Sequence, residues 1–301
     1  MHIRSLLSER IEAAFAHLGL EGQALLQAAS RPEFGDYQAN GVMAAAKRAG
    51  IGAAIHLEPY EGRGAESVAL DLAHLVTHDL YRLPRRPCGG HTRLPVVYLY
   101  DAYHTPAEEW ARLFCDDGDL SVRGTPHDVV VIATLLNRDE EELVVNGCFD
   151  GFYSYFATDG FTYGSTSAHW KLLAAWARKK NLWFSPSAGP GYNDTRIRPW
   201  NDIATRDRKK GAYYRKMLGA AVESGADLVS ITSWNEWGEG TQIEAAAPHL
   251  VHWYDPFRRP GPDIHQWLSS LALSCSSGFR AVRLRDDCKL WLGPMSEVSI
   301  S

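Results

Sequence analysis

The chain has 301 residues, of which 45% are hydrophobic and 22% charged, and its formal net charge is −5. This length suits one large α/β domain or two ordinary ones, and the composition is that of a globular protein with ample material for a core. The acidic balance gives no electrostatic reason to expect a nucleic acid or an anionic membrane as partner, and no apolar run is long enough to span a bilayer.

The first fifty residues predict a short helical segment. Apolar side chains recur at helical spacing over residues 3–18, and Gly19 can supply the left-handed cap. The stretch is amphipathic and lacks the apolar core of a secretory signal. A second helical piece is expected over residues 42–47.

From about residue 51, strand-like and helix-like segments alternate. Strands are expected at 53–58, 95–101, 128–136, 149–156, 182–185 and 228–233, and helices at 65–80, from Thr105 as N-cap, at 140–145, 167–180 and 207–224. Near-continuous apolar strands between helices predict a parallel sheet that is covered on both faces.

These units predict an α/β fold of the (β/α)8 TIM-barrel type that is incomplete. About six strand–helix units lie between residues 53 and 240, whereas a closed barrel needs eight. A doubly wound open sheet is the alternative, because sequence period cannot distinguish the two. We expect three parts: a helical segment over 1–50 that does not replace the absent strands, a partial barrel over 51–260, and a C-terminal helix (263–273) with an irregular tail over 261–301.

The cysteines and aromatic residues give less specific signals. The five cysteines are odd in number and contain no C-x-x-C pair, so a zinc or redox site is not expected. Cys148 lies in an apolar, strand-like run and is interpreted as a small core residue. Ten tryptophans and thirteen tyrosines fit either a large core or platforms for sugar rings.

Carboxylates, phenols and indoles follow the predicted strands. They are found in Glu58-Pro59-Tyr60, Tyr100-Asp101, Tyr153-Ser154-Tyr155 and Trp234-Asn235-Glu236-Trp237-Gly238-Glu239. In parallel α/β folds functional groups gather at the carboxyl ends of strands. Glycoside hydrolases typically use two carboxyl groups for proton transfer and aromatic rings that stack on sugar faces.

Glu236 and Glu239 are the most specific candidates for a pair of catalytic carboxylates. On a straight strand they would point to opposite faces, so we expect Gly238 to let the chain turn and bring both to one pocket. The flanking Trp234 and Trp237 could form an apolar wall that raises the pKa of one carboxyl, as a general acid requires. Two solvated loop acids, or an acid that caps the next helix, are the alternatives.

Other polar residues admit structural readings. His56 is interpreted as a hydrogen-bonded core residue rather than a ligand. Asp101 could cap a turn. Arg198 could bind sugar hydroxyls, steady a carboxylate, or form a structural ion pair. The basic run over 206–210 is interpreted as a solvated helix start.

Several long stretches resemble glycoside hydrolase family 99, the endo-α-mannosidase family. They are residues 149–165, which begin Phe-Asp-Gly-Phe-Tyr; 187–195, Ser-Ala-Gly-Pro-Gly-Tyr-Asn-Asp-Thr; 198–201, Arg-Pro-Trp-Asn; and 232–244, which contain Trp-Asn-Glu-Trp-Gly-Glu-Gly. The stretches 56–60 and 98–101 fit the same family, so the resemblance covers about residues 52–260. It implies a (β/α)8 barrel that cleaves internal α-mannosidic linkages with retention, acting on an α-mannoside oligosaccharide or mannan.

The resemblance also implies site residues. Glu236 would take the proton from the sugar's 2-hydroxyl, and Glu239 would be the general acid and base. Substrate-binding positions would be Tyr155, Arg198, Glu58, Tyr60, Asp101, Asn235 and Trp237. The family needs neither a metal nor an organic cofactor. The family's first strands and an aromatic-rich substrate loop have no recognisable counterpart before His56.

Residues 1–50 are similar to a different family. Ser5-Leu6-Leu7-Ser8-Glu9 and Phe34-Gly35-Asp36-Tyr37-Gln38-Ala39-Asn40-Gly41 resemble the N-terminal tRNA-contacting domain of bacterial arginyl-tRNA synthetase. A chimaeric reading frame or a natural fusion would explain this. Besides an endo-mannosidase, the chain could therefore be an inactive carbohydrate-binding remnant or a tRNA-binding fragment, although its acidic balance disfavours the latter.

Overall fold

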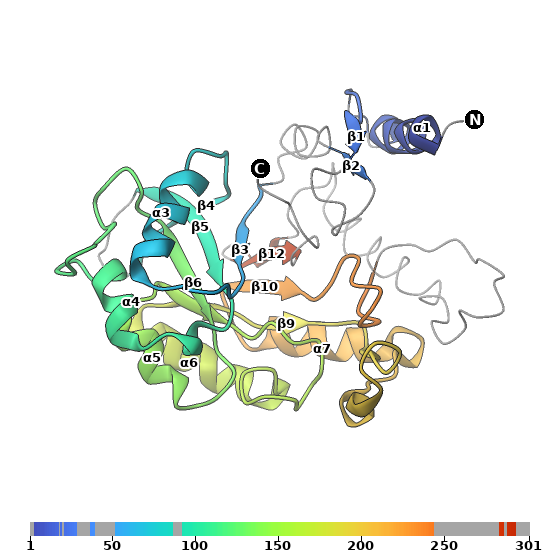
Figure 1. The fold of residues 1–301 in the computed structure, drawn as a ribbon. Helices are drawn as coiled ribbons and strands as arrows, with labels where there is room; N and C mark the ends of the chain where they lie inside the picture. Colours follow the sequence, from blue (N-terminus) through green and yellow to red (C-terminus); the bar gives the residue numbers. More distant parts are fainter. Residues whose placement is uncertain are drawn as a thin grey trace.

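The computed structural model of the protein describes residues 3–17, 19, 21–28, 37–39, 52–86, 92–243, 283–285 and 288–292. The helices expected over 42–47 and 263–273 lie outside these residues. Figure 1 shows a body of strands with helices on its outer side, and α1 and β1 drawn apart from these helices.

The elements are, in chain order, α1 (Ile3–His17), β1 (Leu26–Ala28), β2 (Tyr37–Ala39), β3 (Ile55–Leu57), α3 (Ala65–Leu75), β4 (Arg82–Pro84), β5 (Arg93–Leu99), η2 (Ala102–His104), α4 (Ala107–Phe114), β6 (Val130–Thr134), α5 (Glu140–Asn146), β7 (Gly151–Tyr153), η3 (Ser167–His169), α6 (Trp170–Lys180), β8 (Trp183–Ser185), β9 (Ser187–Ala188), η4 (Pro199–Ala204), η5 (Lys209–Gly211), α7 (Ala212–Glu223), β10 (Leu228–Ile231), β11 (Arg283–Arg285) and β12 (Cys288–Leu292).

The parallel strands follow one another in sequence order. β3, β5, β6, β7 and β8 pair in parallel, and β4 adds to β5 in the antiparallel sense. A second sheet holds β9, β10 and β12 in parallel, with β11 antiparallel to β12. Only Pro186 separates β8 from β9, so one stretch of chain pairs with β7 on one side and with β10 on the other.

Two apolar clusters distinguish a barrel from an open sheet. Alternate residues of β5, β6, β7, β8 and β10 belong to different clusters. The outer cluster combines strand residues such as Val97 and Phe152 with helix residues such as Trp170. The fully or nearly fully buried members of the inner cluster come from strands alone: Leu83, Val96, Tyr98, Val130, Ile132, Tyr153, Trp183 and Leu228. Strand residues that pack only on other strands fill the interior of a (β/α)8-type barrel, so this architecture is confirmed over the doubly wound alternative.

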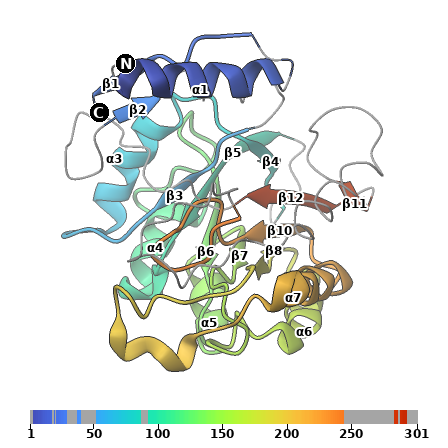
Figure 2. The same cartoon turned by 90° about the vertical axis from the view of Figure 1, so that its right-hand side faces the viewer.

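The helices close the outer face of the strands. In α4, Trp110, Leu113 and Phe114 are buried, and the N-cap is Pro106 rather than Thr105 as predicted. Helix α6 is followed by its C-cap Asn181, which has a left-handed conformation (φ 57°). Its last turn contains Arg178, Lys179 and Lys180, where cations suit the helix dipole. Figure 2 shows α5, α6 and α7 side by side below the strands.

Most predicted elements in the central region are confirmed; two corrections concern this region and two concern the ends of the chain. The helix expected over 65–80 ends at Leu75. Strand β4 was not predicted. The N-terminal segment is not purely helical, because β1 and β2 pair with each other. The tail over 261–301 is not simply irregular, because β12 pairs with β10 and extends the parallel order. The first fifty residues supply no strand to either large sheet within the described ranges.

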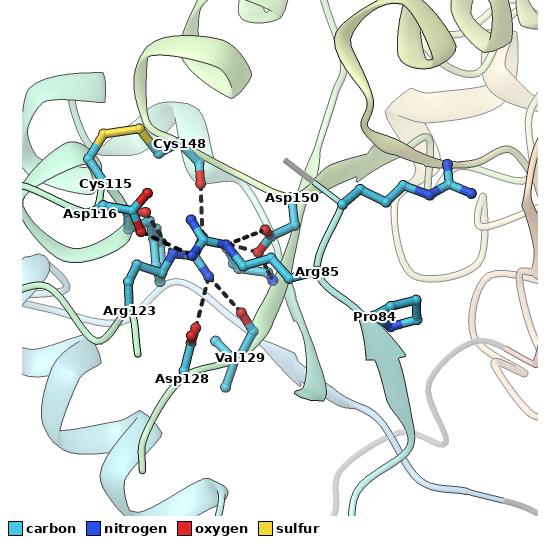
Figure 3. A network of polar contacts seen from close by, with 12 residues as sticks. Pro84, Arg85, Cys115, Asp116, Arg123, Asp128, Val129, Cys148 and Asp150 are labelled. Atoms are coloured by element: carbon cyan, nitrogen blue, oxygen red, sulfur yellow. Dashed lines mark hydrogen bonds and ion pairs between the residues drawn. A yellow bond between two sulfur atoms is a disulfide. The ribbon is translucent and has the colours of Figure 1, made fainter. Parts of the chain in front are cut away.

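A buried polar network closes the amino ends of the strands (Figure 3). Arg123, whose side chain is 2% exposed, lies 3.1 Å from both Asp128 and Asp150. Its guanidinium also donates to the carbonyls of Phe114, Val129 and Cys148. Asp150 further accepts from the Val131 amide at 2.9 Å, so this buried charge is hydrogen-bonded on several sides.

The interpretation of Cys148 as a small core residue is incomplete, because Cys148 packs against the outer cluster but is also covalently bonded. Cys148 forms a disulfide with Cys115, and the bond joins the ends of α4 and α5. Nothing local in the sequence marks this pair, because the two cysteines have a sequence separation of 33 and only the packing of the two helices brings them together. Among the residues described, no helix is long and apolar enough to cross a membrane.

Candidate active site at the carboxyl ends of the strands

A cluster of rings caps the inner apolar cluster at the carboxyl ends of the strands. His56 lies 5.1 Å from Tyr100 and 5.6 Å from Tyr155, nearly parallel to the latter, and edge-on to Tyr153. Tyr100 and Tyr155 are 4.8 Å apart and pack on the inner cluster. These rings come from β3, β5 and β7, so the barrel itself fixes their positions.

His56 links this ring cluster to the first carboxylate. Its Nδ1 lies 2.7 Å from the carboxylate of Glu58, and its Nε2 is hydrogen-bonded to the hydroxyl of Tyr153. The His56 side chain is 6% exposed, which fits the interpretation as a hydrogen-bonded core residue. Because both ring nitrogens are engaged, His56 orients Glu58, which is 60% exposed at the rim.

The acidic turn is held by hydrogen bonds across its base. Ser233 donates its amide to the Thr241 carbonyl at 3.0 Å, and the Ser233 hydroxyl lies 2.8 Å from that of Thr241. The same hydroxyl accepts the amide of Glu236 at 2.9 Å. Ser233 and Thr241 therefore connect the end of β10 to the segment that follows the turn, and the Ser233 hydroxyl positions the backbone of Glu236.

The glycine that allows the turn is not the one expected. Gly240 has φ 67°, a conformation that favours glycine, whereas Gly238 is absent from the positive-φ residues. Gly238 instead allows a close approach, since an added Cβ would lie 3.3 Å from Ile197 Cδ1. Trp234 and Trp237 are 40% and 39% exposed. Their rings therefore stand partly in solvent beside the turn.

The three glutamates act on the same phenol. Burial raises the pKa of Tyr155 above its usual value, and the negative charges of Glu239, Glu236 and Glu58 raise the pKa further. Tyr155 therefore remains a protonated hydrogen-bond donor. Its backbone lies in the left-handed region (φ 43°), which is costly for a tyrosine and occurs at functional sites.

Arg198 connects the turn to a buried aspartate. Its Nη1 lies 3.0 Å from Glu239 Oε1 and 3.0 Å from Asp194 Oδ2. The side chain of Asp194 is fully buried, whereas that of Glu239 is 22% exposed. The hydrogen bonds to these two carboxylates raise the pKa of Arg198, so its positive charge is fixed. The amide of Asn193 also donates to the Glu239 carbonyl at 2.9 Å.

The other residues predicted for the site are Asp101, Asn235 and Tyr60, and they differ in their hydrogen-bond partners. Asp101 (φ 45°) follows β5, and its backbone amide donates a hydrogen bond to the hydroxyl of Thr134 at 2.7 Å. Burial raises the pKa of Asp101. Asn235 has a buried side-chain oxygen without a hydrogen-bond partner in the described part of the chain. Tyr60 is not brought into the ring cluster, because its hydroxyl donates to Asp71 on α3.

Sequence reasoning did not single out Asp194 or Arg208. Asp194 stands in the stretch 187–195, but nothing local marks it as the partner of Arg198. Arg208 belongs to the basic run over 206–210, yet it donates to the carbonyls of Gly240 and Gln242 and thus holds the second half of the turn. Burial lowers its pKa to about 10. The solvated interpretation of Arg208 is wrong.

No group of three or more histidine, cysteine or acidic side chains is arranged to hold a metal ion in the part of the chain that the structure describes. The site combines the carboxylates of Glu58, Glu236 and Glu239 with several phenols, one histidine and one fixed arginine. Such a set can accept and donate protons and present rings to an apolar sugar face.

Comparison with known proteins gives one long match and one short match. A sequence model of glycosyl hydrolase family 99 matches residues 12–258. A rat glycoprotein endo-alpha-1,2-mannosidase is 42% identical over 218 residues, which are 71% of this chain and 46% of the relative. The chain thus spans about half the length of such relatives.

A solved structure agrees with the long match. The GH99 endo-alpha-mannosidase of Bacteroides thetaiotaomicron is 38% identical and has a TM-score of 0.69, covering 78% of this chain and 75% of that one. The short match is to an arginine–tRNA ligase of Chromobacterium violaceum, 58% identical over 48 residues, which are 16% of this chain and 8% of the ligase. Both resemblances expected from the sequence are confirmed.

Proposed function

Because the chain belongs to glycosyl hydrolase family 99, we propose that it cleaves internal α-1,2-mannosidic linkages with retention of configuration. The substrate would be an α-mannoside oligosaccharide, such as an N-glycan arm or a mannan. The observation that best supports the proposal is the turn after β10, where the Ser233 hydroxyl accepts the amide of Glu236 and the Arg198 guanidinium lies 3.0 Å from the carboxylate of Glu239.

In the first step, Glu236 removes the proton from the 2-hydroxyl of the mannose that will be cleaved. The freed oxygen attacks the anomeric carbon from the face opposite to the leaving group and forms a 1,2-anhydro sugar. Glu239 donates its proton to the departing glycosidic oxygen, which leaves as the hydroxyl of the second product. This route differs from the carboxylate nucleophile that most retaining enzymes use.

In the second step, Glu239 takes a proton from water, and the resulting hydroxide attacks the anomeric carbon. The carbon–oxygen bond of the anhydro ring breaks, and Glu236 returns the proton to the 2-oxygen. Two inversions at one carbon give overall retention, and both glutamates end in their starting protonation states. A turn that carries both acids three residues apart supports this exchange.

Other residues of the site would bind the sugar. The Tyr155 phenol can donate to a sugar oxygen, and the unpaired amide oxygen of Asn235 can accept from a sugar hydroxyl. Trp237 offers an exposed ring face beside the turn. Asp101 and Glu58 can accept hydroxyl hydrogens at the rim. We assign Tyr60 the weakest role, because Asp71 already engages its hydroxyl.

The direct test is hydrolysis of a defined α-1,2-linked mannotetraose by the 301-residue chain. We expect release of a reducing oligosaccharide, and a loss of about 10²–10⁴-fold in kcat/KM in Glu239→Gln and in Glu236→Gln. Glu223→Gln, a substitution of an exposed glutamate on α7, is the matched control and should keep activity. Equal activity in all four proteins would refute the assignment of the acids.

A second test addresses the chemistry of the first step. A substrate whose reacting mannose lacks the 2-hydroxyl should bind without being cleaved, because it has no internal nucleophile. Proton NMR of the first product of the normal substrate should show the α-anomer. A β-anomer, or a covalent glycosyl adduct on Glu236, would contradict the mechanism. Mannoside binding without turnover would instead indicate a carbohydrate-binding remnant, and salt-sensitive tRNA retention would indicate a function of residues 1–50.

A further inference from the structure

Asp194 is a buried carboxylate that no part of the proposed reaction uses. Its side chain is fully buried. A single oxygen, Oδ2, accepts hydrogen bonds from the Tyr192 hydroxyl at 2.8 Å, the Asn201 amide at 2.9 Å and the Arg198 guanidinium at 3.0 Å. Burial alone would raise the pKa of Asp194, but these hydrogen bonds outweigh it and hold the pKa below the usual value.

One cation is therefore shared by two carboxylates. The same Nη1 atom of Arg198 lies 3.0 Å from Asp194 and 3.0 Å from Glu239. The Asp194 carbonyl also accepts the amides of Ile197 and Arg198, at 2.9 and 2.7 Å, so the short loop that carries Arg198 is built around Asp194. The position of the guanidinium against Glu239 is thus fixed from the Asp194 side.

The groups that face Glu239 come from several elements. Asp194, Arg198 and Tyr192 belong to the adjoining loop, whereas Tyr100 and Tyr155 stand at the ends of β5 and β7; Glu236 and Glu58 face the same Tyr155. Burial is the first cause that raises the pKa of each of these three tyrosines, so they stay neutral. Among these groups Arg198 carries the positive charge, and Asp194 and Glu239 both pair with its guanidinium.

This competition matters because Glu239 must alternate between two states. The proposed function requires it to hold a proton when the glycosidic bond breaks and to lack one when water attacks. The Arg198 guanidinium lies 3.0 Å from Glu239 and attracts its negative charge, and a second carboxylate on the same nitrogen weakens that attraction. We propose that Asp194 is a positioning residue that, through Arg198, sets the pH range in which Glu239 carries its proton.

The inference rests on the proposed function, and two charge changes of opposite sign test it. In Asp194→Asn, the Arg198 guanidinium pairs with the Glu239 carboxylate only. The alkaline limb of the pH profile of kcat/KM should therefore shift to a lower pH by about 0.5–1 unit. In Arg198→Gln the limb should move up by a similar amount. Tyr192→Phe removes a hydrogen bond to the same oxygen without removing charge, and should leave the limb in place.

An aryl mannoside with a very acidic leaving group gives a second control, because its departure needs no proton from Glu239. With this substrate the limb shift of Asp194→Asn should shrink or vanish. A purely structural role of Asp194 would lower the rate at all pH values and leave the limb where it is in the wild-type protein. That outcome, or shifts of the same sign in Asp194→Asn and Arg198→Gln, would overturn the inference.

A titration without substrate separates this inference from the proposed function. Carboxyl ¹³C NMR of the glutamate-labelled protein, with the Glu239 signal assigned by its loss in Glu239→Gln, should show a lower titration midpoint in Asp194→Asn. If the wild-type chain turned over no mannoside but the midpoint still moved, the proposed function would fail and the coupling would stand. An unmoved midpoint would overturn the coupling itself.

Discussion

The guanidinium of Arg123 lies 3.1 Å from the carboxylate of Asp150, and both side chains are almost completely buried. The pair stands at the amino ends of the strands, opposite the candidate site. Removing one member of a buried pair leaves an uncompensated charge, which typically costs about 3–5 kcal/mol. We expect Asp150→Asn to lower the free energy of unfolding by about 3 kcal/mol in urea titrations.

The matched control for this prediction is Asp116→Asn. Asp116 also faces an arginine, Arg85, at 3.1 Å, but its side chain is 65% exposed. Solvent screens such pairs, so a loss below about 1 kcal/mol is expected. Equal losses in the two variants would show that burial of the Arg123–Asp150 pair does not govern its contribution. Activity per folded molecule should be unchanged in both variants.

The disulfide between Cys115 and Cys148 should contribute to stability through the unfolded chain. It closes a loop across a sequence separation of 33 residues, and bonds of this kind typically stabilise by about 2–4 kcal/mol. The double substitution Cys115→Ser with Cys148→Ser should lower the free energy of unfolding by that amount. Mass spectrometry of a non-reduced digest should find the linked peptide pair, and its absence from oxidised protein would refute the bond.

Asp101 should cost stability at neutral pH. Burial raises its folded pKa above the unfolded value, so the folded state binds the proton more readily. The contribution of protonated Asp101 to the free energy of unfolding is therefore present at low pH and is lost as the pH rises through the pKa of Asp101 in the folded state. Asp101→Asn has no such charge, and asparagine tolerates the left-handed backbone at this position (φ 45°).

Unfolding titrations at pH 4 and pH 7 can check this sign. The stability of Asp101→Asn relative to the wild-type chain should be higher at pH 7 than at pH 4, while mannoside turnover falls. A difference that is the same at both pH values would exclude titration of Asp101 as the cause. Such a gain in stability with a loss of activity is expected where a site keeps a costly group for function.

Tyr155 should act as a neutral hydrogen-bond donor. Its raised pKa keeps the phenol protonated across the working range, and hydrogen bonds to charged groups contribute about 1.5–3 kcal/mol. Tyr155→Phe should therefore lower kcat/KM by about 10–150-fold. Tyr163→Phe removes a comparable hydroxyl, which is hydrogen-bonded to Glu141 at 3.3 Å away from the ring cluster, and should leave kcat/KM unchanged.

The candidate site was partly predictable because strand ends can be located from local patterns. The apolar runs before Tyr100 and Tyr155 marked where their strands stop, and parallel strands bring such ends to one rim. The pairing of Arg198 with Asp194 and Glu239 was not predictable in the same way. It joins a loop to a turn 41 residues further along the chain, and only the barrel sets that distance.

The proposed division of the chain at residues 50 and 260 stays a prediction. The family match begins at residue 12 and overlaps the segment that resembles a tRNA ligase. Within the described residues, β1 and β2 pair only with each other, as a separate N-terminal segment would.

The sequence by itself determined the alternation of strands and helices, the family, and the acidic turn with Glu236 and Glu239, because hydrophobic period and contiguous motifs are local properties. The tertiary structure decided that the sheet is a barrel, that Cys148 pairs with Cys115, that Gly240 rather than Gly238 takes the left-handed conformation, and that Arg198 is shared by two carboxylates. A local sequence pattern indicates only that a side chain is buried. Which distant side chain buries it depends on the path of the whole chain.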